Sequence, residues 1–390
     1  MTRTPFAPPE LLLLGPGPSP VPHEVLAAQT APLLGHLDRD FLSLMEQVQH
    51  DLRLVFETQN RLTIPISGTG SAGMEAALVN LVEPGDRVVV GVIGVFGARL
   101  AEIARRLGGE VVEVKVPFGQ ALDPAEMRRA IAAGPTKVVA VVHAETSTGV
   151  LQPLPQILDA AEAAGAVSVV DCVTSLGGAP IAIDPLGIDC AYSGSQKCLS
   201  VPPGLAPITF GPRALARMQQ RKHKPVSWYL DVGLIASYWG TDRVYHHTAP
   251  ISAIYGLAAG LRLVLDEGLD QRQRRHREVA QALWQGVAAL GLELAVAEPL
   301  RTPMVTAIKV PAGVDEAQVR WRLREVHHIE VGAGLGEWKG KVWRIGLLGH
   351  GARTESVLRV LAGLAECLTA QGRACDGVGA LRAAAGVAGR

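Results

Sequence analysis

A chain of 390 residues is longer than one hydrophobic core usually supports, so two domains are expected. Lysine plus arginine and aspartate plus glutamate both number 37, which gives no net field for binding nucleic acid or an anionic membrane and favours a small-molecule partner. The five cysteines form no CxxC pair and no Cys/His ligand spacing, which argues against a disulfide framework or a zinc site and favours a cytoplasmic location.

The N-terminal stretch contains a run of four leucines that is followed at once by "GPGPSPVP". This run is too short for a signal sequence or a membrane span, so neither is expected. We expect residues 1–20 to form an arm that packs back onto a smaller domain.

Residues 61–210 alternate short Val/Ile-rich runs with amphipathic Ala/Leu/Glu-rich stretches. That alternation is typical of βαβ units and predicts an α/β fold with a mostly parallel sheet, in a large domain over residues 21–262. The candidate strands are 87–93, 110–116, 137–143, 166–171, 189–194 and 206–210.

Two long helical patterns follow, at 251–268 and 270–291, and strand patterns recur near 303–311 and 342–348. They predict a smaller C-terminal α+β domain over residues 263–376, joined to the large domain through a helical connection around 255–270. Residues 377–390 are predicted to be a frayed tail.

The motif "SGTGSAGMEAAL" begins at Ser67, after an apolar run and before a helical pattern. Its backbone N–H groups and hydroxyls could bind a phosphate at a helix N-terminus, although a tight strand-to-helix turn explains it equally well. Gly68, Gly70 and Gly73 also spell G-x-G-x-x-G. A dinucleotide site would need an acidic residue at the end of the next strand, and 87–93 ends without one.

Asp171 follows a run of valines, and Lys197 follows the next predicted strand, so both are expected at one edge of the sheet. Each has a simpler alternative: a helix N-cap or salt bridge for the aspartate, and a solvated loop position for the lysine. Together with the phosphate loop they match the needs of pyridoxal phosphate (PLP). This cofactor requires an anion site, a carboxylate that keeps its pyridine nitrogen protonated, and an amine.

With these motifs the sequence resembles the class V aminotransferases of fold type I, in particular the alanine–glyoxylate and serine–pyruvate aminotransferases. The resemblance covers nearly the whole chain. It implies a PLP-dependent transferase fold with a mostly parallel seven-stranded sheet in the large domain, and a homodimer. The stretches that carry it are "GPGPSPVP", "SGTGSAGMEAALVNLVEPGD", "HAETSTGVLQPL", "VVDCVTSLGG", "YSGSQKCLSVPPG", "YHHTAPISAIYGL" and "KVWRIGLLG".

The resemblance implies Lys197 as the Schiff-base lysine and Asp171 as the partner of the pyridine nitrogen. Val173 would pack on one face of the ring and Phe96 on the other. The family often has tryptophan at the position of Phe96. A plain core aromatic remains the alternative for Phe96. The phosphate loop would consist of Thr69, Gly70 and Ser71. Relatives carry histidine at the position of Ser71.

Thr146 would contact the ring oxygen of the cofactor, and Gln196 would lie at or near the phosphate. Tyr245 and Thr248 would reach the phosphate in the neighbouring subunit, the alternative being that "YHHT" is a surface loop. Arg344, inside an apolar strand, suits a substrate carboxylate, with a structural ion pair as the alternative.

The implied reaction is transamination of alanine or serine with glyoxylate or pyruvate. An aspartate- or aminophosphonate-specific transaminase is the nearest alternative, and no second arginine is assigned to a distal carboxylate. A cysteine desulfurase or lyase would need a cysteine facing the site, and Cys198 points away from it if the segment is extended. A non-catalytic binding protein and a nicotinamide-binding protein are the alternatives from other classes.

Overall fold

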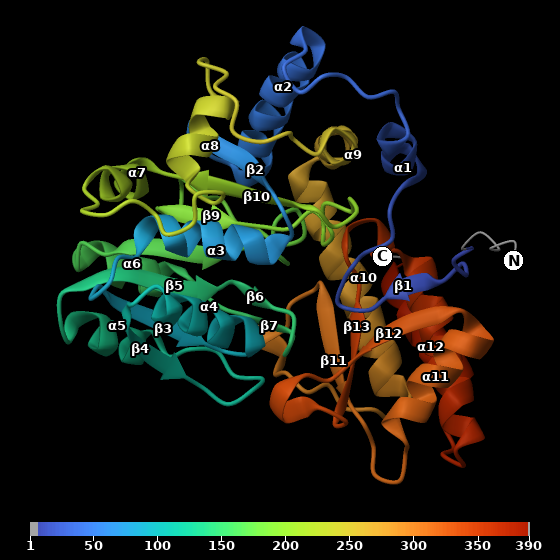
Figure 1. Ribbon diagram of the computed structural model, residues 1–390. Coiled ribbons are helices and arrows are strands. Elements are labelled where there is room, and N and C mark those ends of the chain that lie inside the picture. Colours follow the sequence, from blue (N-terminus) through green and yellow to red (C-terminus); the bar gives the residue numbers. More distant parts are fainter. Residues whose placement is uncertain (1–6, 389–390) are drawn as a thin grey trace, which may run out of the picture.

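The computed structural model describes residues 7–388 and shows a large α/β domain beside a smaller domain (Figure 1). The large domain is built on a seven-stranded sheet in the order β2-β10-β9-β8-β5-β3-β4. β10 runs antiparallel to both neighbours, and the other pairs are parallel, so the predicted mostly parallel seven-stranded sheet is confirmed. The strands are β2 (Leu62–Ser67), β3 (Arg87–Val92), β4 (Glu110–Lys115), β5 (Thr136–Val142), β8 (Val167–Asp171), β9 (Cys190–Tyr192) and β10 (Leu205–Phe210).

Burial along the strands follows their place in the sheet. The central strand β8 is buried throughout, whereas β4 at the edge has only exposed and half-buried residues. Valine-rich runs without alternation are typical of parallel strands covered on both faces. The helices of the large domain are α1 (His23–Gln29), α2 (Arg39–Phe56), α3 (Gly70–Leu81), α4 (Val95–Arg106), α5 (Pro124–Ala132), α6 (Pro155–Ala163), α7 (Pro212–Gln219), α8 (Val232–Trp239) and α9 (Ile251–Glu267).

A second, four-stranded sheet in the order β1-β12-β13-β11 forms the small domain together with the helices α10 to α13. The N-terminal strand β1 (Leu12–Leu14) pairs in parallel with β12 (Ile329–Ala333), so the described part of the arm does join the small domain. The sequence patterns missed both of these strands, and also β2. The remaining elements are β11 (Val305–Lys309), β13 (Val342–Gly346), α10 (Leu269–Ala289), α11 (Glu316–His327) and α12 (Thr354–Ala370), with the short hairpin β6 (Ala144–Glu145) and β7 (Val150–Leu151) near the domain junction.

The helical connection between the domains has no break at the predicted boundary between residues 262 and 263. α9 continues to Glu267, and the chain turns at Gly268, whose φ of 80° is unfavourable for residues with a side chain. α10 then runs along the small domain (Figure 1). The turn lies within the connection expected around 255–270.

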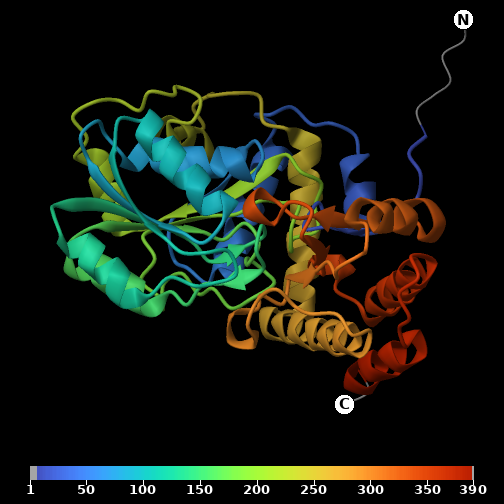
Figure 2. The ribbon, with the colours of Figure 1, turned by 90° about the horizontal axis from the view of Figure 1, so that it is seen from below.

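The predicted frayed tail is wrong for the described residues 377–388. They form α13 (Gly377–Ala388), which packs beside α10 and α12 (Figure 2). Ala380 and Ala384, one helical turn apart, are fully buried, because small side chains allow the helices to approach closely. Within residues 7–388, no helix is long and apolar enough to cross a membrane.

Candidate active site

A cavity of about 180 Å³ lies in the large domain, where β8 ends and α3 begins. It brings together nine of the residues predicted from the sequence: Thr69, Gly70, Ser71, Phe96, Thr146, Asp171, Val173, Gln196 and Lys197. Met74, Arg99, Val142, Ala144 and Thr174 also line it and were not predicted. A larger groove of about 1130 Å³ beside α10 and α13 contains none of the predicted residues.

The N-terminus of α3 faces this cavity with unused hydrogen-bond donors. Thr69 is the N-cap residue, but its hydroxyl makes no capping bond. The backbone N–H groups of Gly70 and Ser71 have no partner among residues 7–388. Nearby, the Oε1 atom of Gln196 is buried without a hydrogen-bond partner. The open N–H donors at the start of α3 fit an anionic ligand such as a phosphate, whereas the buried Oε1 acceptor needs a hydrogen-bond donor.

The three glycines of the G-x-G-x-x-G motif are explained by close packing rather than by a dinucleotide. A Cβ atom on Gly70 would lie 3.1 Å from Val173 Cγ2, and one on Gly73 would lie 3.0 Å from the Cβ of Ala206. Gly68 has a φ of 155°, and a Cβ there would lie 2.6 Å from Ala72. Gly68 thus permits a tight turn, and Gly70 and Gly73 allow the backbone to pack closely against neighbouring residues.

Asp171 ends β8 as predicted, and its carboxylate is held by two donors. The backbone N–H of Val173 donates to Oδ1 and the hydroxyl of Tyr192 donates to Oδ2, both at 2.8 Å. Burial raises the pKa of Asp171 to about 6, although these hydrogen bonds and the charge of Lys197 oppose the rise. A cation in the cavity would favour the ionised form of Asp171. A pyridine nitrogen, in turn, needs this ionised carboxylate beside it to stay protonated.

Lys197 is not the solvated loop lysine that its sequence neighbours allow. Its Nζ donates to the carbonyl oxygen of Pro16 in the N-terminal arm, and a side chain at Gly17 would collide with it. Burial, together with the positive charge of Arg344, lowers the pKa of Lys197 to about 8. An amine with a lowered pKa is a better nucleophile near neutral pH.

Glu145 is a buried carboxylate of the site that the sequence reading did not single out. Its Oε2 accepts from the backbone N–H groups of Phe96 at 3.1 Å and Gly97 at 3.3 Å, so it binds the N-terminus of α4. Its Oε1 accepts from the backbone N–H and the hydroxyl of Ser147. Burial raises the pKa of Glu145 against these hydrogen bonds. The acidic residue inside "HAETSTG" could have drawn attention to Glu145 in the sequence. The carboxylate of Glu145 holds the N-terminus of α4, the helix that carries Phe96.

Arg344 lies on β13, beside the cavity but not among its lining residues. Its Nε donates to the carbonyl oxygen of Ala333 and its Nη1 to that of Thr146, both at 2.7 Å. Burial lowers the pKa of Arg344 to about 10, against the charge of Glu145. No carboxylate within residues 7–388 forms an ion pair with it, so the structural ion pair considered from the sequence does not occur there.

Tyr245 and Thr248 lie outside the cavity of their own chain. Both are exposed, and their hydroxyl oxygens are 3.4 Å apart. The two histidines between them point inward: His246 stacks on Trp228, and the Nε2 of His247 lies 2.7 Å from the hydroxyl of Ser67, directly before the phosphate loop. The segment is therefore anchored to that loop while the tyrosine and threonine face outward.

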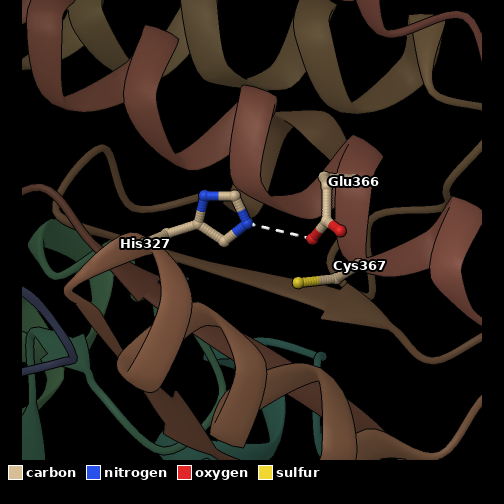
Figure 3. Close-up of side chains that lie close together, drawn as sticks. All are labelled: His327, Glu366 and Cys367. Atoms are coloured by element: carbon tan, nitrogen blue, oxygen red, sulfur yellow. Dashed lines mark hydrogen bonds and ion pairs between the residues drawn. The ribbon is translucent and has the colours of Figure 1, made fainter.

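A separate cluster of His327, Glu366 and Cys367 lies between α11 and α12 (Figure 3). Glu366 accepts from Arg322 and from His327, and these bonds lower its pKa to about 2. Burial raises the pKa of the Cys367 thiol to about 12, which disfavours the thiolate that metals bind. Because Arg322 already holds both carboxylate oxygens, the cluster is an ion-pair network that joins the two helices.

The comparisons with known proteins agree with this site. The family model described as aminotransferase class-V matches residues 12–337. The alanine–glyoxylate aminotransferase of Oryctolagus cuniculus is 42% identical over 375 residues, which cover 94% of each chain. Among solved structures, an alanine–glyoxylate aminotransferase of Nostoc sp. has a TM-score of 0.93 at 46% identity, covering 94% of this chain and 98% of its own.

The ureidoglycine–glyoxylate aminotransferase of Bacillus subtilis has a TM-score of 0.97 at 39% identity and covers 99% of this chain and 100% of its own. The similarity therefore extends over both domains. A family model that spans most of the chain, together with relatives of this identity, shows that the chain belongs to the class V aminotransferases, enzymes that depend on PLP.

Proposed function

We propose that this aminotransferase transfers the amino group of a small amino acid, alanine or serine, to glyoxylate, with pyruvate as a second acceptor. The observation that carries the proposal is the meeting of Lys197, Asp171 and the open N-terminus of α3 in one cavity beside the unpaired Arg344. The names of the relatives described above support glyoxylate as the acceptor.

The residues of the cavity fit the parts of PLP, which when bound supplies an electron sink for negative charge at the substrate α-carbon. Asp171 keeps the pyridine nitrogen protonated, and Val173 and Phe96 pack on the ring. Thr146 contacts the ring oxygen. The phosphate is bound by the α3 N-terminus and by Gln196, whose side-chain amide N–H2 group is the donor available to it. The phosphate-binding residues in this proposal are Thr69, Gly70, Ser71 and Gln196.

Lys197 would attach the cofactor covalently, and as a free amine its Nζ would accept the proton that leaves the substrate α-carbon. The lowered pKa of Lys197, about 8, leaves part of the amine unprotonated near neutral pH, as both roles require. Arg344 binds the substrate α-carboxylate. Two carbonyl oxygens fix the plane of its guanidinium, and its remaining N–H groups are free to form a charge-assisted pair.

A cysteine desulfurase is disfavoured by the position of Cys198. Cys198 does not line the cavity: its Sγ is buried and donates to the carbonyl oxygen of Thr174, and burial raises its pKa to about 11. An aspartate- or aminophosphonate-specific transaminase remains the alternative, and a substrate panel separates it from the proposed activity.

We also propose a homodimer in which Tyr245 and Thr248 reach the cofactor phosphate of the partner subunit. Exposed apolar side chains lie close to this segment, as is common at interaction sites. Val244 precedes Tyr245, Trp228 stacks on His246, and the ring of His36, beside the exposed Leu37, lies 5.2 Å from the Tyr245 ring. The five free cysteines fit a reducing cytoplasmic compartment.

The test is the visible absorption spectrum of the purified protein with PLP. The band of the bound cofactor is expected to disappear with L-alanine or L-serine and to return with glyoxylate. Loss of the band only with L-aspartate would assign the alternative substrate, and sulfide release from L-cysteine would assign a desulfurase. Lys197→Ala is the control, because it removes the covalent attachment and with it the band.

A further inference from the structure

Arg99 is a cation at the mouth of the cavity that the proposed reaction does not use. It lies on α4, and its Nη1 donates to the hydroxyl of Ser71 at 3.1 Å. Its Cζ is 4.8 Å from the centre of the Phe96 ring, so the guanidinium lies against that ring. The side chain thus reaches from α4 to the beginning of α3.

The ionisable residues that line the cavity differ in their partners. Asp171 accepts a tyrosine hydroxyl, and Lys197 donates to a carbonyl of the N-terminal arm. Arg99 bonds only to the neutral hydroxyl of Ser71, and no carboxylate within residues 7–388 pairs with it. Its charge is therefore available to an anion that enters the cavity.

Two helix N-termini meet at the cavity, and only one of them is open. The N-terminus of α4 is occupied by the buried carboxylate of Glu145, which accepts from Phe96 and Gly97. The first turn of α3 has no acidic residue, and the N–H groups of Gly70 and Ser71 are free among the described residues. An anion is therefore directed to α3, which is the end that Arg99 reaches.

We propose that Arg99 is a charged ligand of the PLP phosphate. It would bind the phosphate together with Ser71, across the gap between α3 and α4. The inference rests on the proposed function in one respect, because it requires PLP in this cavity. A guanidinium with its charge unpaired suits a phosphate dianion, to which it can donate two N–H groups.

The test compares PLP with pyridoxal, which has the same ring and aldehyde but no phosphate. For Arg99→Gln, the dissociation constant of PLP, measured by absorbance titration of the apoprotein, is expected to rise about tenfold. The dissociation constant of pyridoxal is expected to stay unchanged. Inorganic phosphate should also compete less well with PLP in this variant, and Arg99→Lys should restore part of the affinity.

Arg106→Gln is the matched control, since Arg106 lies on the same helix, is exposed and pairs with Glu102 away from the cavity. It makes the same change in net charge and should leave both constants unchanged. Equal weakening of PLP and pyridoxal in Arg99→Gln would show that Arg99 acts through the Phe96 ring, and the proposal would be wrong. An unchanged PLP affinity with a raised KM for L-aspartate would make Arg99 a substrate ligand instead. If the wild-type protein binds neither compound, the proposed function itself fails.

Discussion

Asp171 and Tyr192 occupy paired positions on the adjacent parallel strands β8 and β9, and the tyrosine hydroxyl donates to the aspartate Oδ2 at 2.8 Å. Tyr192 is fully buried, and Gly73 leaves the space beside it, since a Cβ on Gly73 would lie 3.3 Å from the Tyr192 Cβ. The last glycine of the G-x-G-x-x-G motif thus makes room for the residue that binds the carboxylate of Asp171.

Tyr192→Phe is expected to shift the pH dependence of cofactor binding. The hydroxyl stabilises the charged form of Asp171, whose pKa burial raises to about 6, so its removal raises that pKa further. The affinity for PLP should then begin to fall at a pH about one unit higher than in the wild type, as the carboxylate takes up a proton. Titrations of the apoprotein with PLP between pH 5 and 8 measure this fall in affinity.

Tyr238→Phe is the control for this change. Tyr238 is also fully buried, but its hydroxyl donates to the carbonyl oxygen of His36, away from the cavity. This variant should lose a comparable amount of stability, but the pH at which the affinity for PLP begins to fall should not change. An equal shift in both variants would contradict a specific role for Tyr192.

The rate of cofactor attachment is expected to report the lowered pKa of Lys197. Only the unprotonated amine attacks the aldehyde of PLP, and burial lowers the pKa of this amine to about 8. The rate should therefore rise about tenfold per pH unit below pH 8 and level off above it. Stopped-flow absorbance after mixing apoprotein with PLP measures the rate. A midpoint near 10.5, the ordinary value for lysine, would show that the amine is solvated in the apoprotein.

Substitution of Arg344 is expected to impair the binding of substrate but not of cofactor. In Arg344→Lys the fixed guanidinium plane is lost, so kcat/KM for L-alanine should fall at least about tenfold, mainly through KM. The dissociation constant of PLP should change little, because Arg344 does not line the cavity. Steady-state kinetics and PLP titration of the same preparation separate the two effects. A parallel loss of PLP affinity would assign Arg344 to the cofactor instead.

The sequence predicted the parallel sheet because several of its strands are rich in valine, and it predicted the cavity because Asp171 and Lys197 follow two neighbouring predicted strands. It did not predict β1 and β12, which are short and gain their stability from pairing across more than 300 positions of the chain. Local patterns carry no signal for such a contact. The helix at 377–388 was missed for a related reason, since its small residues become a packing surface only against α10.

Residues that act through others were also hard to find from the sequence. Glu145 binds the N-terminus of α4, and Tyr192 binds the carboxylate of Asp171. Neither residue lines the cavity. Arg99 lines it but lies in an ordinary amphipathic helix, where a lysine or arginine usually faces solvent. Only the three-dimensional arrangement shows that its neighbour is the phosphate loop.

Complementation between two inactive variants tests the proposed shared site. One variant carries Lys197→Ala, and the other carries Tyr245→Ala and Thr248→Ala. In a heterodimer, if the site is shared as proposed, the second chain supplies the lysine while the first supplies the intact tyrosine and threonine, so one complete site forms. Co-expression with different affinity tags should therefore restore activity to the purified mixed dimer, up to half that of the wild type. If Tyr245 and Thr248 served the cavity of their own chain, each site in the heterodimer would lack a component, and activity would stay at the level of the separate variants. A chain that remains monomeric during gel filtration would contradict the homodimer directly.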